Sequence, residues 1–246
     1  MRISWAGLMA EPVLFARPVR ERLVLALDVA DLDAATALAR RLKPWFAVVK
    51  VGLELYVAEG PAAVAAFTGE GFDVFVDLKL HDIPTTVRRA ARAIARTGAR
   101  YATVHAAGGA DMLAAAADGF LEGAGAGRDV PTIGLAITVL TSDAEAPGAL
   151  VVERAALARA AGLRGVVCAL AEVAAVRAAV PGMITVVPGM RPIGVARDDQ
   201  HRAGTPEDAW RAGADLLVIG RAVTAAEDPA ESARSLVEAL EAIAAP

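Results

Sequence analysis

The sequence is poor in cysteine, histidine and aromatic residues. Among 246 residues there is one cysteine, Cys168, there are three histidines, and aromatic residues make up 4% of the chain. A single cysteine excludes an intramolecular disulfide and fits a reducing cytoplasm, and a chain of this length can bury a large core without a covalent staple. We expect a core of small aliphatic side chains, because apolar residues reach 56% and alanine and valine supply much of that fraction.

Long apolar runs and blocks of like charge are also missing. No run approaches the roughly 20 apolar residues that a membrane-spanning helix needs. The net charge at pH 7 is −4, with no basic block along the chain. This balance argues against nucleic acid or a membrane as the main partner.

The first 20 residues differ from the rest of the chain. They combine apolar side chains with few charges, but Glu11 and Pro12 interrupt the apolar part and no clean cleavage site follows. They therefore make a poor signal peptide. We expect residues 1–20 to be a docking or disordered extension and residues 21–246 to be a single domain, since no low-complexity linker divides them.

One pattern repeats from residue 22 onward. A short β-branched apolar run is followed by polar residues or glycine, and then by an alanine-rich and leucine-rich stretch with helical spacing. The predicted strands cover residues 23–28, 46–52, 73–79, 101–106, 132–140, 165–169, 184–190 and 216–220. The predicted helices cover residues 31–43, 61–67, 85–97, 111–122, 149–161, 171–179, 206–212 and 229–244.

This alternation favours an α/β fold with a parallel sheet covered by helices, and eight such units fit a closed (β/α)8 TIM barrel. A doubly wound open sheet is the alternative, but the glycine-rich turn that favours it is missing after the first strand. Active-site groups of a barrel lie at the carboxyl ends of its strands. The candidates at or near those ends are Asp28, Lys50, Asp77, Lys79, His105, Thr138, Thr141, Pro188, Gly189, Gly220 and Arg221.

Several helix ends carry local signals. Asp31 and Thr205 are suited to cap helix N-termini with a side-chain oxygen, and Pro61 suits a first helical turn. Glycine just past a helix suits a left-handed cap, and the predicted caps are Gly98, Gly162 and Gly213.

Charge is concentrated in the segment Asp77-Leu78-Lys79-Leu80-His81-Asp82-Ile83-Pro84, at the end of the third predicted strand. Side chains alternate along a strand, so Asp77 and Lys79 should share one face and the two leucines should take the other. With Lys50 and Asp82 they can form an alternating array of two cations and two anions. Flanking carboxylates keep a lysine protonated, which suits a proton donor to a carbanion. The alternative is a buried salt-bridge network that serves packing alone.

The last third of the chain has the pattern of a phosphate site. Val187-Pro188-Gly189-Met190-Arg191-Pro192 follows the seventh predicted strand, and Val218-Ile219-Gly220-Arg221 ends the eighth. Barrels often bind phosphate with the loops after these strands, where glycine admits the anion and arginine holds it. Residues 193–204 lack periodicity, so we expect a lid over the phosphate, with a plain solvated loop as the alternative.

A metal site is not favoured. His81 and His105 could join the nearby acids, but the chain has no HxH or HxxxH spacing. Other candidates have a structural alternative. Asp28 is also suited to cap a helix, although Asp31 suits that role better. Cys168 and the tryptophans Trp45 and Trp210 are expected to be packing residues.

Together these segments resemble the orotidine 5′-phosphate decarboxylase family. The resemblance runs from about Leu23 to Pro229. Its main signature is Asp77-x-Lys79-x-x-Asp82 followed by Ile83-Pro84 and Thr86. Other matching segments, specific in their order and spacing, are Leu27-Asp28, Lys50-Val51-Gly52, Leu140-Thr141-Ser142, Pro188-Gly189-Met190-Arg191-Pro192, Asp199-Gln200 and Val218-Ile219-Gly220-Arg221-Ala222-Val223-Thr224.

The resemblance implies an activity and a role for each matching residue. It implies decarboxylation of orotidine 5′-phosphate to UMP in pyrimidine biosynthesis, without metal or organic cofactor, by a homodimer with shared active sites. Lys79 would protonate C6 of the pyrimidine, and Asp77 would lie beside the substrate carboxylate. Asp28 and Lys50 would contact the ribose, and Thr141 would contact the pyrimidine. Gln200 would lie between base and phosphate, and the phosphate would be bound by Arg191, Gly220 and Arg221, with Pro188 in the same segment as Arg191. Asp82 and Thr86 would enter the neighbouring subunit's site.

Two alternatives stay open. A Mg2+-dependent sugar-phosphate decarboxylase or aldolase of the same structural group shares Asp-x-Lys-x-x-Asp, but a small residue and glycine typically follow its motif in place of Ile83-Pro84. A non-catalytic nucleotide-phosphate-binding barrel would explain the phosphate residues but not Lys79 between two carboxylates. Thr85, where many members of the resembled family carry asparagine, is a small departure beside the retained Thr86.

Overall fold

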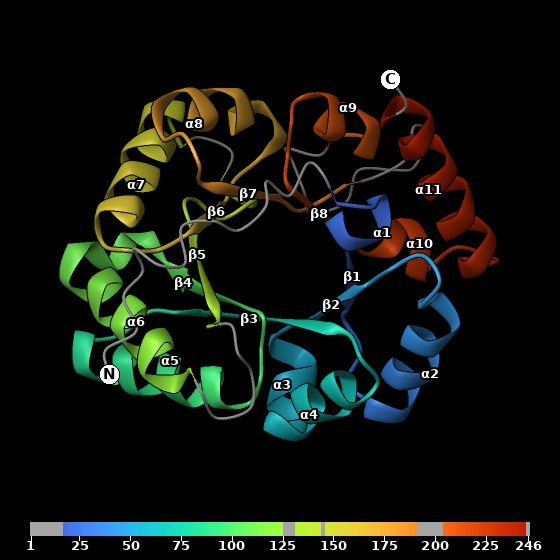
Figure 1. Ribbon diagram of the computed structural model, residues 1–246, viewed down its shortest axis with the longest axis horizontal. Coiled ribbons are helices and arrows are strands. Elements are labelled where there is room, and N and C mark those ends of the chain that lie inside the picture. Colours follow the sequence, from blue (N-terminus) through green and yellow to red (C-terminus); the bar gives the residue numbers. More distant parts are fainter. Residues whose placement is uncertain (1–16, 125–130, 144–145, 191–203, 245–246) are drawn as a thin grey trace.

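The computed structural model describes residues 17–124, 131–143, 146–190 and 204–244. In this part of the chain, eight parallel strands close into a barrel in the order β1 to β8, with β1 paired to β8 (Figure 1). The predicted (β/α)8 barrel is therefore confirmed. The strands are β1 (Leu23–Leu27), β2 (Val48–Val51), β3 (Asp73–Leu80), β4 (Tyr101–His105), β5 (Ile133–Ile137), β6 (Gly165–Val167), β7 (Ile184–Val187) and β8 (Leu216–Ile219).

Helices form a ring around the barrel (Figure 1). The α-helices are α1 (Val19–Arg22), α2 (Leu32–Leu42), α3 (Leu53–Glu59), α4 (Pro61–Gly69), α5 (Pro84–Arg96), α6 (Gly109–Gly123), α7 (Gly148–Ala160), α8 (Val173–Ala179), α9 (Pro206–Arg211), α10 (Arg221–Thr224) and α11 (Pro229–Ala244). Two short 3-10 turns, η3 (Ala106–Gly108) and η4 (Leu170–Glu172), follow β4 and β6. No helix of the described residues is long and apolar enough to cross a membrane.

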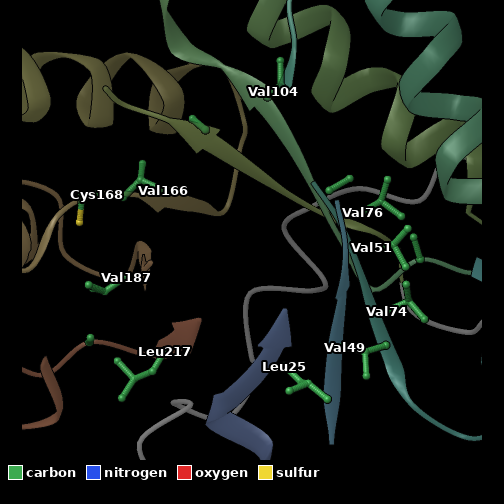
Figure 2. Packing of buried hydrophobic residues seen from close by; sticks show 14 of the residues in the cluster. Leu25, Val49, Val51, Val74, Val76, Val104, Val166, Cys168, Val187 and Leu217 are labelled. Atoms are coloured by element: carbon green, nitrogen blue, oxygen red, sulfur yellow. The ribbon is translucent and has the colours of Figure 1, made fainter. Parts of the chain in front are cut away.

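The side chains of the strands alternate between two buried layers. Those that point outward, such as Leu25, Val49 and Val74, pack against the helices in one large cluster (Figure 2). Those that point inward, such as Val48, Phe75 and Tyr101, fill the barrel as a second cluster. Phe75 and Tyr101 meet there edge to face, with ring centroids 6.2 Å apart. The inward series determines which residues reach the carboxyl end of the barrel.

The local signals at the helix ends are confirmed. Asp31 accepts a hydrogen bond from the backbone N–H of Ala34, and Thr205 accepts one from Asp208. Pro61 begins α4. Gly98, Gly162 and Gly213 have φ angles of 85°, 92° and 83°, the left-handed conformation expected of glycine caps.

The predicted elements differ from the observed ones in several places. The prediction missed α3, a seven-residue helix that Gly60 ends with a φ of 63°. The predicted strands 132–140 and 184–190 were too long, because β5 ends at Ile137 and β7 at Val187. Beyond these strands, Val139 and Met190 are buried and line a cavity instead of continuing the sheet.

Candidate active site

A layer of polar side chains lies inside the barrel at the carboxyl ends of its first four strands. Each polar residue of this layer comes two positions after an inward-facing core residue. The pairs are Ala26 and Asp28, Val48 and Lys50, Phe75 and Asp77, and Tyr101 and Thr103. Strand alternation carries each of these side chains to the same face as the core residue before it. The carboxyl end of the barrel is therefore polar over β1 to β4.

The charged side chains of this layer form a continuous array. Lys50 Nζ lies 2.8 Å from Asp28 Oδ1 and 3.9 Å from Asp77 Oδ2, and Lys79 Nζ donates to both Asp77 oxygens at 2.9 Å. The side chain of Lys50 is 10% exposed and that of Asp77 is 15% exposed. Charges this buried are stable only when paired, which the alternating order achieves. Gly52 leaves space for the Lys50 ammonium, because a Cβ at position 52 would lie 3.0 Å from Lys50 Nζ.

Lys79 reaches the array from an irregular stretch of β3. The pairing register with β4 shifts between Val76 and Leu80, and Lys79 has a φ of 51°. The prediction of a regular strand was wrong at this point, although Asp77 and Lys79 do meet. Leu78 and Leu80 pack on the outer cluster, as predicted.

Thr103 on β4 is a residue of this layer that the sequence analysis missed. Its hydroxyl accepts a hydrogen bond from the backbone N–H of Lys79 and donates one to Asp77 Oδ1, each 2.9 Å long. The side chain is buried, and its inward position two residues after Tyr101 was the available signal.

A cavity of about 460 Å³ opens above the array. Its charged side carries Asp28, Lys50, Asp77 and Lys79, and its opposite wall is apolar. A cavity of this size suits a small molecule with an apolar ring and polar substituents. The apolar wall, which the sequence analysis also missed, comes from the strands β5 to β8 as Ile137, Val167, Val186 and Val218.

The candidates for phosphate binding lie at the same cavity. Pro188, Gly189, Gly220 and Arg221 line it together with Thr141. Gly220 immediately precedes α10, so its backbone stands where strand β8 turns into that helix. Two further candidates, Arg191 and Gln200, and residues 193–203 of the proposed lid lie outside the described residues.

The candidates Asp82, Thr86, Thr138 and His105 do not line the cavity of the single chain. Asp82 and Thr86 are exposed, and Asp82 accepts a hydrogen bond from the backbone N–H of Ile83. The anion at the end of the array is thus Asp28 in this chain, where the sequence analysis had placed Asp82. Thr138 is buried and donates to the Val167 carbonyl at 2.7 Å, which is a packing role.

His81 and His105 stack beside the array, with ring centroids 5.3 Å apart. His105 Nδ1 accepts a hydrogen bond from the backbone N–H of Ala107. Burial, followed by the neighbouring His81, Arg154 and Lys79, lowers the pKa of His105 below its usual value. No group of three or more potential metal-ligating side chains occurs among the described residues.

These features define a class of protein: a (β/α)8-barrel enzyme with a charged array facing an apolar wall at the carboxyl ends of its strands. Residues 21–236 match the family model of the Orotidine 5'-phosphate decarboxylase / HUMPS family. The chain belongs to this family, which confirms the resemblance drawn from its motifs.

Individual relatives support the same assignment. The chain is 52% identical over 231 residues to an orotidine 5'-phosphate decarboxylase of Anaeromyxobacter sp. (strain K), covering 89% of this chain and 98% of the relative. It is 48% identical over 237 residues to one of Moorella thermoacetica, covering 91% and 94%. The crystal structure of orotidine 5'-phosphate decarboxylase from Lactobacillus acidophilus matches with a TM-score of 0.76 and 32% identity, covering 91% of this chain and 99% of that one.

Proposed function

We propose that this protein decarboxylates orotidine 5′-phosphate to UMP and CO2 in pyrimidine biosynthesis. The observation that carries the proposal is the Lys79 ammonium, held by both oxygens of Asp77 at 2.9 Å on the floor of a cavity with an apolar wall. Family membership and the names of the relatives agree with this reaction.

Charge on the array accounts for the chemistry. The bond between C6 and the carboxylate carbon breaks, its electron pair stays on C6, and CO2 leaves. The Lys79 ammonium stabilises the developing carbanion electrostatically and transfers a proton from Nζ to C6, which completes UMP. The neutral lysine regains a proton from solvent. Asp77, next to the leaving carboxylate, disfavours the bound ground state relative to the transition state.

The remaining residues hold the substrate in the proposed complex. Asp28 and Lys50 bind ribose hydroxyls, and Thr141 contacts the pyrimidine. The apolar wall offers a dry surface to the ring, which strengthens the electrostatic effect of the array. The phosphate is bound by Arg191, Gly220 and Arg221, next to Pro188, with Gln200 between phosphate and base. All of these steps use side chains and backbone of the protein, and the proposed reaction needs no cofactor.

The proposed active unit is a homodimer in which Asp82 and Thr86 enter the partner's site. Both side chains are exposed in the single chain and lie next to the array along the sequence. Large apolar side chains are exposed nearby in the sequence and on α3: Ile83 is 66% exposed, Leu53 54% and Val57 80%. A second copy that covers them would gain apolar burial. We place the enzyme in the cytoplasm, in keeping with its one cysteine.

A direct assay tests the reaction. Purified protein with EDTA should convert orotidine 5′-phosphate to UMP, followed by ultraviolet absorbance. Lys79→Ala should lower kcat by at least about 10²-fold, because the proton donor is lost. An inactive, folded wild-type protein would refute the proposal, and activity that EDTA abolishes would favour the metal-dependent sugar-phosphate class.

Mixed dimers test the shared site. Lys79→Ala and Asp82→Ala each damage every site of their own homodimer. A heterodimer of the two has one site with intact Lys79 and an intact partner Asp82, so mixing should restore part of the activity. Demonstrated heterodimers without recovery would show that Asp82 does not act across the interface.

A further inference from the structure

We propose that Thr103 is a positioning residue for the charged array, which deepens the proposed decarboxylation and rests on it. Its hydroxyl joins the backbone of Lys79 to the carboxylate of Asp77, so that the proton donor and its neighbouring anion are held as one rigid unit. Thr103 itself lies beneath the cavity and is not among the residues that line it.

The backbone of Lys79 needs such support. Among the described residues, Lys79 is the one non-glycine residue with a positive φ, at 51°. The left-handed region is disfavoured for residues with a Cβ, and strained residues persist where the surroundings fix them. The register of β3 against β4 also shifts at this point, which removes regular strand pairing as the source of that support.

Thr103 supplies it across the irregular stretch. Its Oγ1 accepts from the N–H of Lys79 at 2.9 Å and donates to Asp77 Oδ1 at 2.9 Å. An amide can only donate and an ionised carboxylate can only accept, so the orientation of the hydroxyl is fixed by its partners. A hydroxyl is both donor and acceptor, and therefore serves both groups at once.

Burial and side-chain shape make this link stiff. Thr103 is 1% exposed, so water cannot readily replace its hydroxyl. A β-branched side chain also has few accessible rotamers on a strand. Asp77 Oδ1 is held at the same time by Lys79 Nζ, which closes a loop of contacts from backbone to carboxylate to ammonium. Loss of the Thr103 hydroxyl would leave both the Lys79 amide and Asp77 short of one partner.

The consequence for catalysis is a selective loss of turnover. Displacement of Lys79 Nζ and Asp77 acts on the transition state, whereas the proposed ribose contacts are made by Asp28 and Lys50 and the proposed phosphate contacts by residues that follow β7 and β8. We expect Thr103→Val, which keeps the shape but removes the hydroxyl, to lower kcat by about 10-fold to 100-fold, the effect of a misplacement on the order of 1 Å. KM and the Kd for UMP should change by less than about threefold, since ground-state binding is retained.

Two further variants complete the test. Thr103→Ser restores the hydroxyl and should return kcat to within about fivefold of wild type. Thr132→Val removes another buried threonine hydroxyl, one that donates to the Ala99 carbonyl at 2.7 Å just before β5, and should leave kcat unchanged. Equal kcat in Thr103→Val and Thr132→Val, or a Thr103→Ser variant as slow as Thr103→Val, would overturn the proposal.

A structural readout separates this inference from the reaction itself. In a crystal structure of Thr103→Val we expect the Lys79 φ to leave the left-handed region and Nζ to move out of hydrogen-bond distance of Asp77. Unchanged Lys79 geometry would refute the positioning role even if the wild-type protein proved inactive on orotidine 5′-phosphate. If Thr103→Val does not fold, the same measurements on Thr103→Ala against Thr103→Ser decide the question.

Discussion

Lys50 shows why removal of a single charged residue from the array is costly. Its ammonium is nearly buried and lies between Asp28 and Asp77, while Asp77 in turn lies between two ammonium groups. Removal of one member leaves a neighbour buried without its counter-charge, which is more costly than the net value of the intact pair. The alternating order of charges therefore holds Lys79 Nζ in place against Asp77.

His105 leads to a prediction about pH at the scale of one side chain. Its pKa is lowered chiefly by burial, with His81, Arg154 and Lys79 adding repulsion. The unfolded chain, with an ordinary histidine pKa of about 6.5, then binds the proton before the folded chain does. The stability that the neutral imidazole contributes is present above about pH 6.5 and is lost as the pH falls through the lower, folded pKa.

The measurement is the thermal midpoint of unfolding between pH 8 and pH 5. We expect His105→Gln to flatten the decline of Tm at acid pH relative to wild type, because the titrating group is gone. At pH 8 both proteins have a neutral side chain there, so that comparison gives the cost of the substitution itself. Tm curves that stay parallel over the whole range would contradict a lowered pKa at His105.

At the scale of secondary-structure elements, the packing of α5 on α6 fixes the direction in which the chain leaves β3 after the Asp77–Asp82 segment. Helix α5 begins at Pro84, directly after Asp82 and Ile83, so its position sets the direction in which that segment leaves the barrel. It packs closely on α6 through small residues. A Cβ on Gly119 would lie 2.3 Å from the Arg88 carbonyl oxygen, and one on Gly123 would lie 2.4 Å from Ala95 Cβ.

Gly119→Ala should therefore destabilise the protein. The added methyl group meets backbone rather than a flexible side chain, so the helices must separate, at a cost of about 1–3 kcal/mol. Urea unfolding measures the change. The matched control is Gly69→Ala in α4, where no heavy atom lies within 4 Å of the added Cβ and the residue is exposed, so stability should hold or rise slightly. Equal stabilities of the two variants would contradict the close α5–α6 contact.

The same scale shows what the sequence could and could not predict. Caps at Asp31 and Thr205 depend on neighbouring residues in the chain, so their residue types were sufficient. Helix α3 was missed because it is short and a further helix, α4, follows it without a strand between them. The irregular backbone at Lys79 depends on Thr103 in another strand, and no periodicity within 73–80 reports such a contact.

At the scale of the whole molecule, strand alternation was the informative signal. Once eight strands are placed in a closed barrel, residues two positions apart share the interior, which gathers Asp28, Lys50 and Asp77 from three strands. The apolar wall was not predictable as a wall, because Val167 and Val186 resemble any core residue until the cavity is seen. The proposed placement of Asp82 involves a second chain, and the alternation of side chains within one strand carries no signal of such a partner.

Closure of the barrel leads to a last prediction, about how the molecule opens. Every strand pairs on both sides, so β6 has no free edge from which to fray. Cys168 follows β6, is 2% exposed, and has a thiol pKa raised chiefly by burial. A thiolate is the reactive form of cysteine, so the native thiol should be inert on two grounds, access and protonation. Its reaction should then require global unfolding rather than local opening.

Labelling with a disulfide reagent at pH 8 tests this expectation. The rate at Cys168 should rise with urea, with the same dependence as global unfolding followed by circular dichroism. In a Cys168→Ala background, Ser235→Cys on the exposed side of α11 provides the control and should react at once without denaturant. If Cys168 reacted in water as fast as that control, or independently of urea, β6 would open on its own. Such a result would mean that the barrel does not unfold as one cooperative unit, and that its strands do not form a uniformly rigid support for the charged array.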